Sequence, residues 1–136
     1  MLLYDKNGYI AGIQAGTGPT PADLMTIPMD EEMVIPQTNF VQGKCFYMMG
    51  MHYWYDIAPK LDCKDIFPVF LLYNKKRLNG FGWAFNPNYN NSAKWEHPTR
   101  DKFSMFMKPV PPCLGVDGPT TTLHIYMTDS PRLNLC

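Results

Sequence analysis

The segment Cys45–Asp56 constrains the fold of this chain more than any other stretch. Its twelve residues hold a run of aromatic side chains, three methionines and one of the three histidines of the chain, His52. Exposing that much apolar surface to water costs about 25 cal/mol per Å². We therefore expect the segment to line a core or a pocket and to carry His52 into it.

Length and charge narrow the class of protein. A chain of 136 residues is long enough for one domain with its own core, so we expect residues 1–136 to form a single domain. Lys plus Arg and Asp plus Glu both count 12, and the net charge is zero. This balance argues against nucleic-acid binding, which needs clustered cations. The basic triplet Lys75–Arg77 is predicted to be a solvated hairpin tip, and no apolar run is long enough to predict a membrane span.

Ten methionines and nineteen aromatic residues are the strongest compositional signal (Phe 8, Tyr 8, Trp 3). Methionine fills irregular gaps and contacts aromatic rings through its polarizable sulfur, and it is also common on adaptable binding surfaces. Two interpretations follow: an irregular core, or a pocket for an apolar ligand.

Four dispersed cysteines predict two disulfides and an oxidising compartment. Cys45, Cys63, Cys113 and Cys136 form no C-x-x-C pair and no zinc-like spacing. Of the three pairings, we favour Cys45–Cys63 with Cys113–Cys136, which close local loops. Asn90-Asn91-Ser92 is an N-glycosylation sequon in an expected surface loop. The cysteines and the sequon together predict a secreted protein. Residues 1–5 lack the apolar core of a signal peptide, so a secreted protein would be in its mature form here.

Strand patterns dominate the rest of the chain. Residues 2–13 predict a hairpin around Asn7-Gly8, residues 67–73 a strand buried on both faces, and residues 120–127 a β-branched strand. In residues 80–85, alternation places Phe81, Trp83 and Phe85 on one face and the small Gly80, Gly82 and Ala84 on the other. The small face lets a backbone, a ring or a ligand approach closely.

Helix is expected to be scarce. We expect none within residues 22–36 and one helical turn at most in residues 57–65. Residues 102–108 could form a strand or a short helix, and the alternation of Phe103, Met105 and Met107 favours the strand. The predicted fold class is mainly β, or α+β with little helix. Its architecture is a single antiparallel sheet, a sandwich or a barrel-like domain stabilised by disulfides.

Several longer strings carry a resemblance. They are C-F-x-x-M-G-x-H-Y-W-Y from Cys45, F-P-V-F-L-L-Y-N from Phe67, L-N-x-F-G-W-A from Leu78 and E-H-P from Glu96. Over roughly residues 43–136 the chain resembles a family of uncharacterised secreted invertebrate proteins. The resemblance implies secretion, and it implies no activity, cofactor or site.

The histidines and acids define the enzymatic alternatives. His52, His97 and His124 all lie among aromatic or β-branched residues, and their convergence would create a zinc or copper site. The opposing interpretation is buried histidines bonded to carbonyls or carboxylates. No G-x-S-x-G elbow is present. Two carboxylates could form an acid/base pair if they approach one another, and the candidates are Asp56, Asp62, Asp65 and Glu96.

Together these features predict a secreted, non-enzymatic protein that encloses a small apolar ligand or an apolar patch of a partner. The expected lining is Tyr53, Trp54, Phe81, Trp83 and Phe85, so that the strand of residues 80–85 faces the segment Cys45–Asp56. A metal-dependent or acid/base enzyme centred on His52 is the alternative. A structural extracellular protein with an aromatic core and no cavity is a further one. The sequence predicts neither a cofactor nor an oligomeric state.

Overall fold

The computed structural model describes residues 2–4, 10–13, 25–114, 116 and 121–136. Strands β1 (Leu2–Tyr4) and β2 (Ile10–Ile13) pair antiparallel, so the N-terminal hairpin is confirmed. Its predicted Asn7-Gly8 turn lies outside the described residues. No helix in the described ranges has the length and apolar character needed to cross a membrane.

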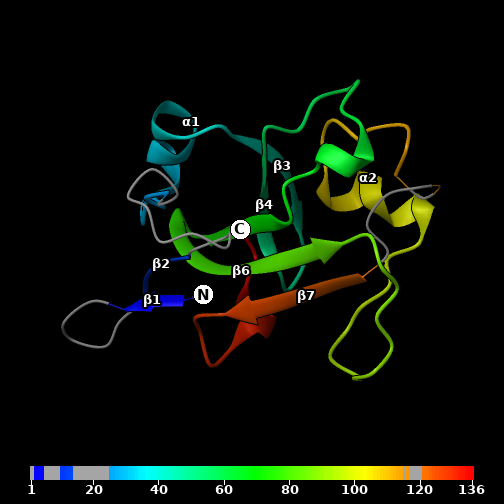
Figure 1. Ribbon diagram of the computed structural model, residues 1–136. Coiled ribbons are helices and arrows are strands. Elements are labelled where there is room, and N and C mark those ends of the chain that lie inside the picture. The colour runs from blue at the N-terminus through cyan, green and yellow to red at the C-terminus, as the bar shows by residue number, and fades with distance from the viewer. Residues whose placement is uncertain (1, 5–9, 14–24, 115, 117–120) are drawn as a thin grey trace.

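The main body is a five-stranded sheet in which every strand pairs antiparallel with its neighbour in the chain (Figure 1). The strands, in chain order and also in sheet order, are β3 (Phe40–Phe46), β4 (Gly50–Tyr55), β5 (Val69–Asn74), β6 (Arg77–Phe85) and β7 (Thr121–Tyr126). The mainly β, antiparallel fold class is therefore confirmed.

The segment Cys45–Asp56 forms parts of two strands joined by a turn. His52, Tyr53 and Trp54 in β4 are buried, as expected. The turn between β3 and β4 is at the surface, with Tyr47 64% exposed and Met48 43% exposed. The expectation of burial is therefore wrong for the turn, because the chain reverses there and only the strands enter the sheet.

The turn between β5 and β6 consists of Lys75 and Lys76. Their φ angles of 49° and 64° are left-handed, as the primed two-residue turns of β-hairpins require. Asn74 pairs with Arg77 across this turn, and Arg77 forms an exposed ion pair with Asp30. The prediction of a basic hairpin tip is confirmed.

Strand register gives the sheet two distinct faces, which we call the first face and the second face. A row across four strands on the first face contains Trp54, Phe70, Gly82 and His124. The adjacent row contains Tyr53, Leu71, Phe81 and Ile125, whose side chains point to the second face. Each face has its own buried cluster, and β5 contributes to both.

The second face is covered by the segment that precedes β3. A 3₁₀ turn, η2 (Glu31–Met33), leads into α1 (Val34–Gln37), and Val34 is fully buried. The Tyr73 hydroxyl donates to the Pro28 carbonyl at 2.6 Å. The expectation of no helix in residues 22–36 is wrong, because Pro36 sits in the first turn of α1, where no helical N–H bond is lost.

The first face is covered by η4 (Arg100–Lys102) and α2 (Phe103–Phe106). Residues 102–108 therefore contain the short helix that was the alternative, and the strand that we favoured is wrong. Figure 1 shows α1 and α2 on either side of β3. Phe103 and Met107 are buried and Phe106 is partly buried, an i, i+3, i+4 spacing that describes a helix facing a core. Met105, which the alternating pattern grouped with Phe103 and Met107, is exposed.

Contacts with β3 and β4 fix the position of α2. Lys44 Nζ donates to the Ser104 carbonyl at 2.7 Å, and Trp54 Nε1 donates to the Phe106 carbonyl at 3.3 Å. A Cβ atom on Gly43 would lie 2.4 Å from that same Phe106 oxygen, so only glycine permits this approach. These donors satisfy carbonyls that a helix end leaves without partners.

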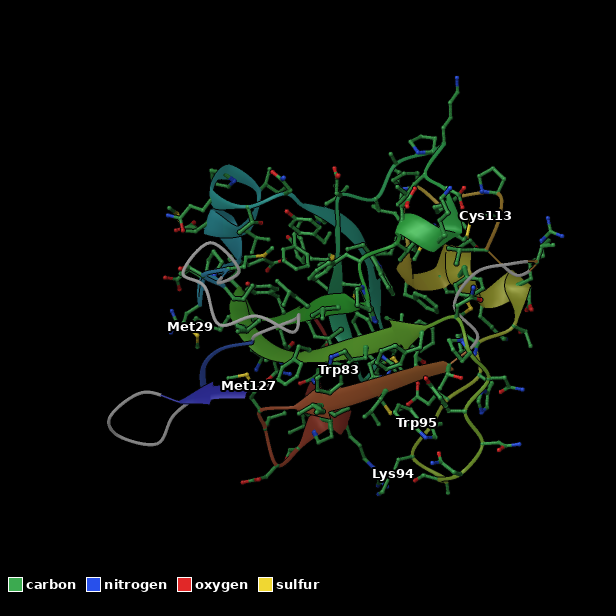
Figure 2. All side chains as sticks on the ribbon, in the orientation of Figure 1. Met29, Trp83, Lys94, Trp95, Cys113 and Met127 are labelled. Atoms are coloured by element: carbon green, nitrogen blue, oxygen red, sulfur yellow. A yellow bond between two sulfur atoms is a disulfide. The ribbon has the colours of Figure 1, made fainter. Side chains whose placement is uncertain are left out.

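The disulfides are Cys45–Cys136 and Cys63–Cys113, so two disulfides form but the local pairing that we favoured is wrong. Cys63 opens η3 (Cys63–Asp65), the expected helical turn, and is buried on the first face. Cys113 lies next to η3 (Figure 2). The C-terminal tail, with η5 (Pro131–Leu133), runs beside the β3–β4 turn, where Met48 N donates to the Asn134 carbonyl at 3.0 Å.

Candidate ligand-binding site

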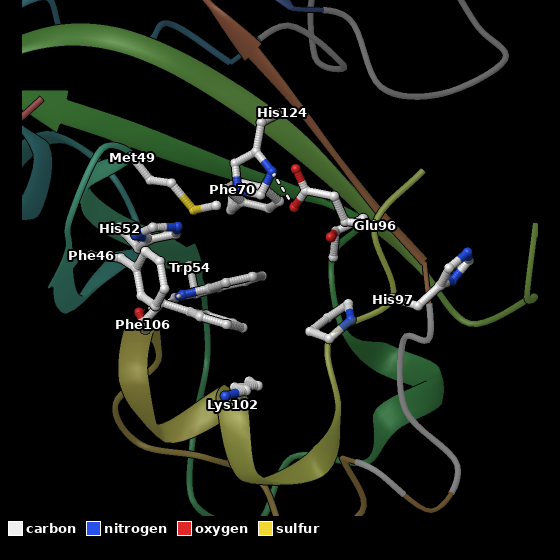
Figure 3. A pocket seen from close by; sticks show the side chains of 12 residues that line it. Phe46, Met49, His52, Trp54, Phe70, Glu96, His97, Lys102, Phe106 and His124 are labelled. Carbon is white, nitrogen blue, oxygen red and sulfur yellow. Dashed lines mark hydrogen bonds and ion pairs between the residues drawn. The ribbon is translucent and has the colours of Figure 1, made fainter. Parts of the chain in front are cut away.

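A cavity of about 220 Å³ lies on the first face, between the sheet, α2 and the loop of residues 86–99 (Figure 3). Glu96 and Lys102 line it with side chains that are 48% and 54% exposed, so they mark its solvent side. Most of the other lining residues are apolar or aromatic. The complete lining is Phe46, Met49, His52, Trp54, Phe70, Glu96, His97, Pro98, Lys102, Phe106, Thr122 and His124.

The small residues of β6 make room for the aromatic floor of this cavity. A Cβ atom on Gly82 would lie 2.2 Å from Cζ of Phe70, so the Phe70 ring rests on the glycine backbone. The sequence-based expectation that the face of Gly80, Gly82 and Ala84 accepts a ring is confirmed. The ring comes from β5, the neighbouring strand in the sheet.

Aromatic rings packed on one another form one wall. The His52 ring stacks with Trp54 at a centroid distance of 6.3 Å and with Phe70 at 5.7 Å. Phe106 of α2 lies 5.5 Å from His52 and 6.0 Å from Trp54. Because each ring contacts several others, the wall is held in place without a ligand.

His52 is the most deeply buried polar group of the site, with 1% of its surface exposed. Burial, and then the neighbouring His124, lower the pKa of His52 from 6.5 to about 3, although the Gly50 and Lys44 carbonyls oppose this shift. His52 is therefore neutral at pH 7. Its Nδ1 lies 3.1 Å from the Gly50 carbonyl oxygen, which can only accept, so Nδ1 carries the proton.

His124 and Glu96 form the polar end of the cavity. His124 Nδ1 lies 3.0 Å from Glu96 Oε2, an ion-pair distance without the angles of a good hydrogen bond. The His124 ring meets His52 edge to face at 6.1 Å and stacks on Tyr126 at 6.0 Å. Burial and the nearby Glu96 raise the pKa of Tyr126 to about 12.

The backbone holds Glu96 in this position. Glu96 and Thr122 form an isolated bridge, exchanging two backbone hydrogen bonds of 2.9 and 2.8 Å. This bridge pins the loop of residues 86–99 to β7, two residues before His124. The backbone bridge between Glu96 and Thr122 therefore positions the Glu96 carboxylate beside the His124 imidazole.

Of the five predicted ligand-binding residues, only Trp54 lines the cavity. Tyr53 and Phe81 belong to the buried cluster of the second face, and Trp83 packs against it. Phe85 contacts Tyr89 and Trp95 of the loop of residues 86–99, where Figure 2 labels Trp95. The predicted enclosure is wrong because residues 81, 83 and 85 share the second face, whereas Trp54 points to the first.

The three histidines line one cavity but do not form a metal site. His52 and His124 are in contact, whereas the His97 imidazole points away from them in Figure 3. Within the described residues there is no group of three or more His, Cys, Asp or Glu side chains placed to hold a metal ion. Glu96 and His97 are consecutive residues of an extended segment, so their side chains point in opposite directions. Because Glu96 points toward His124, His97 points away from it.

The predicted carboxylate pair is not brought together at the cavity. Asp56, Asp62 and Asp65 are exposed and do not line it, and Asp62 caps η3 by accepting from Lys64 N at 3.1 Å. Glu96 alone of the four candidates reaches the site. Asn90 of the predicted sequon is exposed, as a glycosylation acceptor must be.

Phe46 and Met49 belong to the segment Cys45–Asp56, which was expected to line a core or a pocket. Sequence reasoning missed much of the remaining lining, including Phe70, Lys102, Phe106 and Thr122. Strand alternation offered a signal for one of them, because Thr122 shares a face with His124. The i, i+3 spacing of Phe103 and Phe106 offered another. No family model, no curated protein and no solved structure matches this chain. The geometry of the cavity therefore carries the functional conclusion.

Proposed function

We propose that this chain is an extracellular, non-enzymatic binding protein that encloses a small apolar ligand in the first-face cavity. The observation that carries the proposal is a volume of about 220 Å³ walled by Phe46, Met49, Trp54, Phe70 and Phe106. An apolar cavity of about 150 Å³ in another protein binds benzene. The first-face cavity has room for one substituted aromatic ring.

Three further features support this proposal. Two disulfides between distant residues are typical of proteins that fold in an oxidising compartment. The sequon at Asn90 lies in an exposed loop and fits the secretory route. A structural protein with only an aromatic core was expected to have no cavity, so the cavity favours binding over a purely structural role.

The His124–Glu96 pair supports a second candidate, an acid/base enzyme. An imidazole oriented by a carboxylate is the arrangement of a general base, here at the edge of an apolar cavity. Phenyl acetate, whose ring fits the cavity, tests this candidate through general-base hydrolysis. Equal hydrolysis rates for the wild-type protein and His124→Gln would exclude it, whereas at least a hundredfold loss in the variant would support it.

Saturable binding of toluene, measured by titration calorimetry, tests the proposed function. Thr122→Phe adds a ring at the cavity lining and is expected to abolish binding. Leu123→Phe is the matched control, because residue 123 is next in β7 and points to the second face. Absence of toluene binding to the wild-type protein, or equal binding to both variants, would contradict the proposal.

A further inference from the structure

Resting on the proposed function, we infer the chemical class of the ligand: a small neutral aromatic molecule with one hydrogen-bond donor, such as a phenol or an indole. Its ring lies against the aromatic wall, and its O–H or N–H donates to Nε2 of His124. The chemical class follows from which groups of the cavity can donate and which can only accept.

Glu96 sets the proton position of His124. A carboxylate can only accept, and Oε2 of Glu96 lies 3.0 Å from Nδ1 of His124. When the imidazole is neutral, the negative charge of Glu96 favours the proton on the nearer nitrogen, Nδ1, and the lone pair then lies on Nε2. Figure 3 shows the other edge of the His124 ring turned toward the side of the cavity lined by Met49 and His52. The cavity thus contains an acceptor on a side chain that is only 8% exposed.

His52 does not supply a donor to the same end of the cavity. Its Nδ1–H is directed at the Gly50 carbonyl, and burial keeps the ring neutral, so its Nε2 can also only accept. The indole N–H of Trp54 is used by the Phe106 carbonyl. A donor on the ligand satisfies Nε2 of His124, whereas a ligand that brings only acceptors leaves this nitrogen without a partner. The hydroxyl of Thr122, the remaining buried polar group of the lining, can donate or accept and so fits either kind of ligand.

The charged groups of the lining favour a neutral ligand. Lys102 and Glu96 have opposite charges and both are about half exposed, so the mouth attracts neither cations nor anions strongly. An anionic ligand would place its charge beside the acceptors and beside Glu96. A cationic ligand would have to leave water for a cavity that also carries Lys102.

Two probes of nearly equal shape test this inference: 4-methylphenol, which carries the donor, and toluene, which lacks it. The measured quantity is the ratio of the toluene Kd to the 4-methylphenol Kd, in the wild-type protein and in His124→Phe. His124→Phe keeps a ring and removes the acceptor, so the ratio is expected to fall at least tenfold while toluene binding persists. Leu123→Phe is the control, because residue 123 points to the second face and does not line the cavity, and its ratio should stay at the wild-type value.

The outcomes separate the inference from the proposed function. If neither probe binds to the wild-type protein, the proposed function fails. If both bind and the ratio is the same in the wild-type protein and His124→Phe, the ligand class is wrong while the proposed function stands.

Two measurements avoid dependence on the folding of His124→Phe. Glu96→Leu removes the carboxylate that favours the proton on Nδ1 and offers no acceptor in its place, so the advantage of 4-methylphenol is expected to shrink. Long-range ¹H–¹⁵N spectra of the wild-type protein report the protonated nitrogen of His124 directly. A proton on Nε2 in those spectra would overturn the inference.

Discussion

At the scale of single residues, His52 is the clearest example of a group whose chemistry is set by its surroundings. Its ring is held between Trp54, Phe70 and Phe106, and its Nδ1 faces the Gly50 carbonyl. A neutral ring can pack in this stack at little cost, whereas a charged ring would lose its hydration without gaining an ionic partner among the described residues. His52 therefore behaves as part of the aromatic wall, and His124 is the histidine that offers a polar group to the cavity.

This environment predicts a dependence of stability on pH. The pKa of His52 is about 3 in the folded protein and 6.5 when unfolded, so between these values the unfolded chain binds more protons. The contribution of neutral His52 to the free energy of unfolding is therefore fully present above pH 6.5. It decreases by about 1.4 kcal/mol per pH unit as the pH drops from 6.5 toward 3. Urea unfolding at pH 7.5 and 5.0 measures the loss, which should be about 2 kcal/mol larger for the wild-type protein than for His52→Phe.

Leu123→Phe serves as the comparison for this experiment, because it introduces a ring without changing any titratable group. It should keep the pH dependence of the wild-type protein. Parallel pH profiles for the wild-type protein and His52→Phe would show that His52 is not held neutral by burial.

At the scale of secondary structure, alternation along strands predicted the sheet but not the cavity. Periodicity identified β5, β6 and β7, and it separated the large and small faces of β6. It could not give the relative register of β4 and β6, which decides whether Trp54 and Trp83 share a face. The pairing of Trp54 with Phe70, and of Phe70 with Gly82, places Trp54 over the small face.

Short helices were the least predictable elements. In residues 102–108 both a period of two and an i, i+3, i+4 spacing fit the apolar residues, and four residues of helix are too few for propensity to decide. Hydrogen bonds from Lys44 and Trp54 to carbonyls of α2 decide in favour of helix. These donors come from a hairpin more than 50 residues earlier in the chain, so no local pattern contains them.

Gly82→Ala tests the packing of strands on the first face. The added Cβ would lie 2.2 Å from Cζ of Phe70 and 2.4 Å from the Leu123 carbonyl oxygen. We expect a loss of about 1–3 kcal/mol in the free energy of unfolding, measured with urea. Phe70→Leu in the same chain should recover part of this loss, because it removes the ring but not the backbone contact. A change below about 0.5 kcal/mol in Gly82→Ala would contradict this packing of Phe70 on the glycine.

At the scale of the whole molecule, the disulfides join segments that are far apart in the sequence, whereas the predicted pairing joined neighbouring cysteines. The pairing favoured from the sequence minimised loop length, whereas the fold brings the C-terminal tail to β3 and the segment after α2 to η3. The hydrogen bonds of Asn74 with Asn134 and Leu135 hold the tail in the same place. Tertiary position therefore decides the pairing, and the spacing of the cysteines along the chain does not reveal it.

Long loops make these crosslinks important for stability. The paired cysteines are 91 and 50 residues apart, and loop-closure entropy predicts about 4–5 kcal/mol for each crosslink. Cys63→Ala with Cys113→Ala should lower the free energy of unfolding by about 4 kcal/mol. Mass spectrometry of a non-reduced digest should find Cys45 linked to Cys136 and Cys63 linked to Cys113. Peptides that link Cys45 to Cys63 would refute the architecture of the first face.

The central claim is that the first face, and not the second, holds an apolar ligand. Intermolecular nuclear Overhauser effects between the methyl protons of 4-methylphenol and the protein test it most directly. The proposed binding mode predicts contacts with Trp54, Phe106 and Met49, together with the ring of His124. Contacts only with Trp83 and Phe85, or none with a saturating probe, would contradict it.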